Sequence, residues 1–167
     1  MVDNTTQKLI PLRQLSTQLF GTSRPVRVGQ KFKVAVTNST ECYLYVFGEE
    51  TDGSSYTLFP YTDKHSPYCG IVGTRIFPRD HSMVADDLGN KDRIAVVVSK
   101  EELPYKELAQ ALNTSRASSF EGKLNQVLGK EQIQRVKFDA TADGAVEFDA
   151  KLAQGEYYVG WVIEVDK

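Results

Sequence analysis

Residues 31–60, KFKVAVTNSTECYLYVFGEETDGSSYTLFP, decide the fold of this chain. From 32 to 36 every second side chain is apolar, which is the period of a strand with one face toward a core. Residues 42–47 are apolar on both faces, as is typical of a strand at the centre of a sheet. Asp52-Gly53 suits a tight hairpin turn, after which residues 55–59 return as a strand. The stretch therefore predicts three consecutive antiparallel strands.

Two later stretches share this apolar character on both faces. Residues 93–98 are rich in valine, and residues 157–165 carry aromatic and β-branched side chains throughout. We expect both to be strands paired inside a sheet. Shorter strand patterns occupy residues 25–30, 74–77, 133–138 and 145–148. Together these patterns predict an antiparallel β-sandwich of about seven to nine strands.

Two helical patterns interrupt the strands. In residues 99–113 a serine and a glutamate have capping-box spacing, and leucines form a stripe at helical period. Pro104 leaves open a second start, with the regular helix beginning only there. Residues 118–129 repeat the capping signal and end at Gly129, a residue suited to a helix C-terminus. The fold class is therefore mainly β (α+β), with two short helices inserted near residues 100–129.

The length of 167 residues fits a single compact unit. Residues 1–24 are expected to form an N-terminal extension that is partly flexible. Within it, residues 12–20 have the spacing of a short amphipathic helix, or form an irregular segment packed against the sheet. Residues 25–167 then form one β-sandwich domain.

Charge and composition exclude several classes of partner. Twenty basic and twenty-two acidic residues give a net charge of −2 without a long basic run, so no nucleic acid is expected. No apolar run approaches the roughly twenty residues that cross a bilayer, so no membrane insertion is expected. The first residues lack the apolar core of a secretory signal. Two compartments stay open, the cytoplasm or export with the signal removed, and the oligomeric state is not indicated.

Two cysteines and two histidines are the candidates for nucleophilic chemistry. Cys42 is predicted to be a buried thiol in the central strand and Cys69 a thiol in a loop, with a disulfide between them as the alternative. A hydrolase would need Cys69 with His65 or His81 as its base. The residues around Cys69 match neither the caspase-type nor the papain-type signature of a catalytic cysteine. A packed thiol and an exposed histidine are therefore the favoured interpretation, and no enzyme is predicted.

Oxygen and nitrogen ligands for a metal lie in two polar loops. The candidates are Asp63, His65, Asp80, His81, Asp86 and Asp87. Their order does not match a calcium-binding loop, so a solvated acidic loop is favoured over a structural ion. Gly-rich phosphate loops, Gly-x-Ser-x-Gly and His-Glu-x-x-His are also missing from the sequence. Neither a metal nor a cofactor is predicted.

The order of motifs carries a resemblance to a known family. Val28-Gly29-Gln30 precedes Tyr43-Leu44-Tyr45-Val46-Phe47, and Asp52-Gly53 precedes Leu58-Phe59-Pro60. Over roughly residues 26–112 this order resembles a bacterial domain of unknown function with a Y-L-Y-V-F … L-F-P signature. Members of that family are appended to caspase-like peptidases or Ser/Thr kinases, or stand alone in exported proteins. The resemblance implies a β-sandwich with an accessory role, without agreed catalytic residues.

We therefore predict a non-catalytic accessory module that binds a protein partner or its own parent chain. The contact surface is expected on the loops at 61–73 and 78–92, because loops carry most binding residues. The candidate contact residues are Tyr61, Tyr68, His65 and His81. A small-ligand or carbohydrate sensor with a concave, tyrosine-lined site is the alternative, and a Cys/His hydrolase ranks third. Trp161 and Phe77 are expected in the core.

Overall fold

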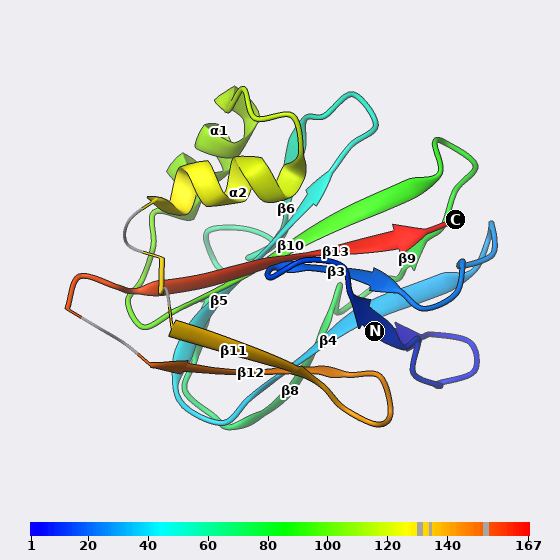
Figure 1. Cartoon of the computed structure of the whole chain (residues 1–167), viewed down its shortest axis with the longest axis horizontal. Helices are drawn as coiled ribbons and strands as arrows, with labels where there is room; N and C mark the ends of the chain where they lie inside the picture. The colour runs from blue at the N-terminus through cyan, green and yellow to red at the C-terminus, as the bar shows by residue number, and fades with distance from the viewer. Residues whose placement is uncertain (130–131, 134, 152–153) are drawn as a thin grey trace.

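The computed structural model describes residues 1–129, 132–133, 135–151 and 154–167, which form a β-rich fold with two helices (Figure 1). The strands are β1 (Val2–Asp3), β2 (Leu12–Gln14), β3 (Leu19–Thr22), β4 (Lys31–Asn38), β5 (Cys42–Glu49), β6 (Ser55–Phe59), β7 (Tyr68–Cys69), β8 (Gly73–Phe77), β9 (Met83–Val84), β10 (Lys91–Ser99), β11 (Arg135–Ala140), β12 (Val146–Lys151) and β13 (Tyr158–Asp166). The helices are α1 (Tyr105–Thr114) and α2 (Phe120–Leu128). The predicted class, a sandwich-like β fold with two short inserted helices, is confirmed. Nine of the described strands have four or more residues; the others are too short for a sequence pattern to reveal.

The main sheet is built around β5, β10 and β13. Its strand order is β2-β3-β13-β10-β5-β6, with the short β7 also paired to β5. β10 runs antiparallel to both neighbours, and Val96 lies opposite Val46 on one side and Trp161 on the other. These three strands are buried over most of their length. The prediction that strands apolar on both faces lie inside a sheet is therefore confirmed.

The two helices cover one face of the main sheet (Figure 1). Tyr45 and Phe47 of β5 pack there against Phe120 and Leu124 of α2, and each of these side chains is at most 1% exposed. α2 begins as predicted, because Oγ of Ser119 accepts a hydrogen bond from the amide of Gly122 at 3.0 Å. The expected cap at Ser99 is wrong for α1. The hydroxyl of Ser99 instead accepts a hydrogen bond from the amide of Glu101, in the turn before the helix.

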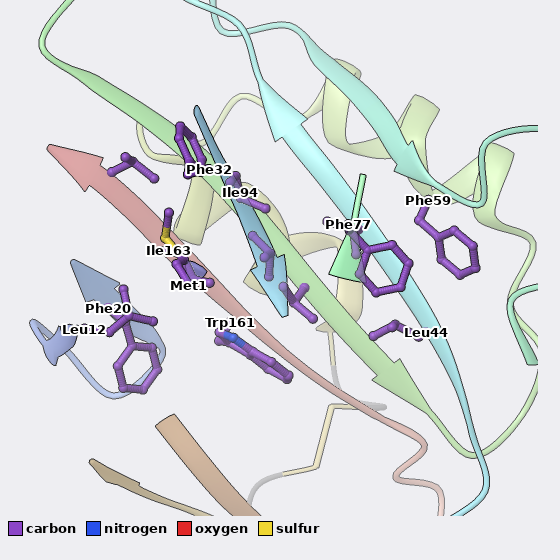
Figure 2. Close-up of a cluster of buried hydrophobic side chains, with 14 of the residues drawn as sticks. Met1, Leu12, Phe20, Phe32, Leu44, Phe59, Phe77, Ile94, Trp161 and Ile163 are labelled. Atoms are coloured by element: carbon purple, nitrogen blue, oxygen red, sulfur yellow. The ribbon is translucent and has the colours of Figure 1, made fainter. Parts of the chain in front are cut away.

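The opposite face of the main sheet packs against β4, β8 and the hairpin of β11 and β12. Figure 2 shows Phe77 of β8 beside Phe59 and near Leu44 of β5. Trp161 of β13 contacts Phe148 of the hairpin, with ring centroids 4.9 Å apart. Trp161 and Phe77 are 8% and 3% exposed, so their predicted core positions are confirmed. The predicted strand at 133–138 corresponds to β11, although Gln134 lies outside the described residues.

The expectation that β4, β5 and β6 pair consecutively is wrong for β4. β5 and β6 form the predicted hairpin, but β4 pairs with β1, β8 and β9 in a second sheet. The side-chain alternation along β4 explains why β4 lies in a different sheet from β5. Its apolar side chains Phe32 and Val34 are buried in the same cluster as Val46 of β5. Side chains that face one another across a core belong to different layers of a sandwich. The two strands are therefore stacked.

Residues 1–24, expected to form an N-terminal extension, contribute strands to both sheets. β1 pairs with β4, while β2 and β3 form a hairpin on the edge of the main sheet. The expected helix at 12–20 is therefore wrong. Leu12 and Phe20 are buried because they lie on two paired strands, a geometry that also brings residues eight positions apart to one face. Residues 25–30, expected as a short edge strand and turn, contain the turn but not the strand, and Val26 is buried.

The close approach of α2 to β13 requires a glycine at position 160. A Cβ placed on Gly160 would lie 2.6 Å from Cδ1 of Leu128. We expect Gly160→Ala to lower the free energy of unfolding by about 1–3 kcal/mol, because overpacking pushes the helix away from the sheet. Urea denaturation measures this cost.

Leu128→Ala supplies the control for this contact. Alone it should cost about 2–5 kcal/mol, because it leaves a cavity. In the double variant the added methyl group occupies part of that cavity, so the two costs should sum to more than the measured loss. Strictly additive costs would show that the contact at Gly160 does not determine how the helix packs.

Candidate functional site

A groove of about 680 Å³ lies beside the second sheet. Its lining combines aromatic and aliphatic side chains from β6, β8 and the segment after β6 with basic side chains. We call it the aromatic-basic groove. Its described lining residues are Val2, Asn4, Gln7, Lys33, Phe59, Tyr61, Lys64, His65, Ser66, Thr74, Arg75, Ile76, Phe77 and Arg79. A concave site with apolar walls and a few convergent polar groups is the usual form of a binding site.

Four aromatic rings follow one another along the groove. Phe77 contacts Phe59 at 4.7 Å between centroids, and Phe59 contacts Tyr61 edge-on at 5.4 Å. Tyr61 in turn contacts the imidazole of His65 edge-on at 5.2 Å. The hydroxyl of Tyr61 accepts a hydrogen bond from the amide of Arg79 at 2.6 Å. Burial raises the pKa of Tyr61, so this side chain stays a neutral phenol at physiological pH.

Two of the four basic side chains of the groove, Lys33 and Arg75, are held in place by uncharged oxygens. Nζ of Lys33 donates to the carbonyl of Arg79 at 2.9 Å. Arg75 donates to Oδ1 of Asn38 at 2.6 Å and to the carbonyl of Ile71 at 3.1 Å. Arg79 has a carboxylate partner in Asp80 at 2.9 Å. None of the described lining residues is acidic. The groove is therefore locally positive although the whole chain is not.

The structure brings two of the four predicted contact residues together. Tyr61 and His65 line the groove, and Nδ1 of His65 lies 3.0 Å from Oγ1 of Thr62. Tyr68 lies apart on β7, 46% exposed, with its ring 5.3 Å from that of Tyr43. His81 lies on an exposed turn beyond β8 and does not line the groove.

Sequence reasoning missed the basic and strand-borne part of the groove. Lys33 and Arg75 lie on β4 and β8, and Phe59 ends β6. Their alternation along each strand shows which side chains share a face. Nothing in that pattern shows which strands are neighbours, so the four cations could not be placed together from sequence.

The two cysteines lie directly opposite one another on β5 and β7. Both are free and buried, which corrects the expectation of a loop thiol at Cys69. Sγ of Cys69 donates a hydrogen bond to the carbonyl of Pro67 at 3.6 Å. The neighbouring Cys42 and the positive charge of Arg75 lower the pKa of Cys69. His65 faces Tyr61 and Thr62 instead. The proposed cysteine–histidine pair of a hydrolase therefore has no geometric support.

A second, smaller hollow of about 380 Å³ contains a chain of ion pairs. Arg93 of β10 contacts Glu49 of β5 at 3.1 Å and Glu164 of β13 at 3.0 Å. Lys123 of α2 contacts Glu49 at 3.1 Å and donates to the carbonyl of Gly53 at 2.5 Å. Because these charges satisfy one another, the hollow is better explained as a structural link between helix and sheet than as a binding site.

Among the described residues, no group of three or more histidine, cysteine, aspartate or glutamate side chains is placed to hold a metal ion. Neither α1 nor α2 has the length and apolar character that crossing a bilayer requires.

Comparison with known proteins gives a match and a partial likeness. Residues 25–102, slightly less than half of the chain, match the model of a domain of unknown function (DUF4384). A stretch of 97 residues is 38% identical to pectate lyase D of Dickeya chrysanthemi, covering 51% of this chain and 25% of that protein. The chain thus spans about a quarter of the length of this curated relative. No solved structure matches the chain significantly.

The range matched by the family model contains most of the candidate site. It extends from before β4 to just beyond β10 and includes both cysteines. The basic and aromatic residues of the groove also lie within it. The resemblance inferred from the sequence motifs is thereby supported at the level of a domain of unknown function.

The hydrogen bond from Arg79 to Tyr61 links the two segments on either side of the groove. We expect Tyr61→Phe to accelerate hydrogen exchange of the Arg79 amide about fivefold, the effect of losing a bond worth about 1 kcal/mol. Tyr68→Phe is the matched control, since its hydroxyl lies elsewhere. Equal protection of the Arg79 amide in both variants would contradict this role of Tyr61.

Proposed function

We propose that this chain is a non-catalytic interaction module whose aromatic-basic groove binds an acidic segment of a protein partner or of its own parent chain. The observation that carries the proposal is the chemistry of the groove, whose described lining combines aromatic and aliphatic side chains with four basic side chains and contains no acidic one. Lys33, Lys64 and Arg75 add positive charge around rings that a ligand could contact. Complementary charge steers a partner to such a site and fixes its orientation.

Exposed apolar side chains favour a polypeptide ligand. Ile76 lines the groove and is 45% exposed. Ile71 and Val72 are 79% and 61% exposed, and the carbonyl of Ile71 accepts a hydrogen bond from Arg75 of the groove. Aliphatic side chains gathered beside a polar rim are typical of protein contact surfaces. An acidic segment with apolar side chains would satisfy both features.

An acidic carbohydrate is the second candidate. The partial likeness to pectate lyase D favours it, because pectate is a polymer of uronic acids with a carboxylate on each unit. Carboxylates at regular spacing would pair with the basic side chains of the groove, while the ring of Tyr61 would contact a sugar face. This candidate corresponds to a carbohydrate-sensing module.

Binding of defined probes to a charge-neutralised groove tests the proposal. The probes are a synthetic peptide of alternating glutamate and leucine, the same peptide with lysine in place of glutamate, and an oligogalacturonate. The variant Lys33→Gln/Lys64→Gln removes two charges from the groove. Fluorescence anisotropy for the peptides and calorimetry for the oligosaccharide give the Kd. We expect the acidic peptide to bind wild type and to bind this variant about tenfold more weakly, the effect of about 1.4 kcal/mol.

The matched control is Arg24→Gln/Arg27→Gln, which removes the same charge from exposed side chains outside the groove. Its Kd for the acidic peptide should equal that of wild type. Tighter binding of oligogalacturonate, lost in the groove variant only, would replace the peptide proposal by the carbohydrate one. Binding of neither acidic probe, or equal weakening in both variants, would contradict a role for the groove.

A further inference from the structure

The thiols of Cys42 and Cys69 are placed to be joined covalently. They face each other in the antiparallel pairing of β5 and β7. Residues in such opposed positions have Cα atoms about 4.5–5.5 Å apart, within the range of about 4.4–6.8 Å found for disulfides. Opposed side chains also project to the same face of the sheet. Both cysteines are also buried in the same apolar cluster between the two sheets.

The charges around the pair favour a thiolate at Cys69. Arg75 lies near both sulfur atoms, and Lys100 lies near Cys42. Arg75 is held by Asn38, whose amide group also donates to the carbonyl of Cys69 at 3.3 Å. These contacts keep a fixed positive charge beside the thiol pair. Because the thiolate is the reactive form of cysteine, this arrangement prepares Cys69 as the attacking group.

We propose that Cys42 and Cys69 form a modification site, at which exchange with a low-molecular-weight disulfide such as glutathione disulfide yields a bond between β5 and β7. The thiolate of Cys69 attacks one sulfur of the reagent, forms a mixed disulfide and displaces one thiolate. Cys42 then attacks the sulfur of Cys69 and displaces the second. The two protein thiols are oxidised and the reagent is reduced to two thiols, which carry away the two protons.

The short length of β7 gives the reagent access to the buried pair. β7 has only two residues and follows a polar segment. Its pairing with β5 involves only residues 42–43 and 68–69, plus a hydrogen bond from the amide of Leu44 to the carbonyl of Pro67. Such a short edge opens locally at low cost compared with the main sheet. Opening of β7 exposes Cys69 while the rest of the sheet stays folded.

The bond would also restrain one wall of the aromatic-basic groove, an effect on binding that rests on the proposed function. Tyr61, Lys64, His65 and Ser66 all lie in the segment between β6 and β7. A bond at Cys69 ties the end of that segment to β5. Fewer conformations of the segment in the free protein mean a smaller loss of entropy on binding. Oxidation is therefore expected to tighten binding at the groove.

Titration in glutathione buffers tests the modification directly. Reduced wild-type protein is equilibrated at rising ratios of glutathione disulfide to glutathione, quenched in acid, denatured and treated with a maleimide. Mass spectrometry then counts free thiols and bound glutathione. We expect both thiols to disappear together without a glutathione adduct. Cys42→Ser and Cys69→Ser should each give at most a mixed disulfide with glutathione, because neither retains a pair.

Retention of both thiols at the most oxidising ratio would overturn the proposal, as would a stable glutathione adduct on wild type without loss of the second thiol. The urea midpoint gives an independent readout on wild type alone. The oxidised protein should unfold at higher urea than the reduced protein, and dithiothreitol should reverse the shift. An unchanged midpoint together with full thiol loss would indicate that the bond joins unfolded or separate chains, which would also overturn it.

The acidic peptide probe, measured against oxidised and reduced wild type, tests the link to the groove. Tighter binding after oxidation would support it, and equal Kd values would overturn it. If the peptide binds neither form while the internal bond forms as expected, the proposed function fails and the modification site stands. If the peptide binds and no bond forms, the reverse holds.

Discussion

Burial of β5 on both faces is the constraint on which the rest of the structure depends. Leu44 and Val46 face one apolar cluster, whereas Tyr45 and Phe47 face another, and all four are at most 2% exposed. A strand in that position requires an apolar layer on each side. The two helices supply one layer, and the second sheet with the hairpin of β11 and β12 supplies the other (Figure 1).

Beyond the residues covered by the helices, the same face of the main sheet carries charged side chains in place of apolar ones. Glu49, Arg93 and Glu164 lie on three adjacent strands and continue the helix-facing side of the main sheet. Arg93 contacts both carboxylates, and Lys123 connects α2 to Glu49. These charged side chains pair with one another, so no unpaired charge among them calls for a ligand. Two cations of the aromatic-basic groove differ, because Lys33 and Arg75 donate to neutral oxygens and so keep their positive charge available to a ligand.

The segment between β6 and β7 connects the two proposals. It begins with residues that line the groove and ends at the thiol facing Cys42. Arg75 also belongs to both, since it lines the groove and contributes positive charge at the sulfur atoms. A binding surface and a modification site that share a segment and a guanidinium group can influence each other without a large rearrangement. The match to a domain of unknown function includes this whole region.

The sequence by itself determined the fold class, the central strands and the two helices, because side-chain period and caps are local properties. It also selected Tyr61 and His65, which a polar segment presents in the groove, but it could not separate them from Tyr68 and His81. Only the tertiary structure decided that β4 is stacked on β5, that residues 12–22 form a hairpin, and that Cys42 faces Cys69. Each of these three features depends on which segment of the chain packs or pairs with a given strand. Pairing between strands is chosen by the whole core, since the same alternating pattern is satisfied by any apolar layer that covers it.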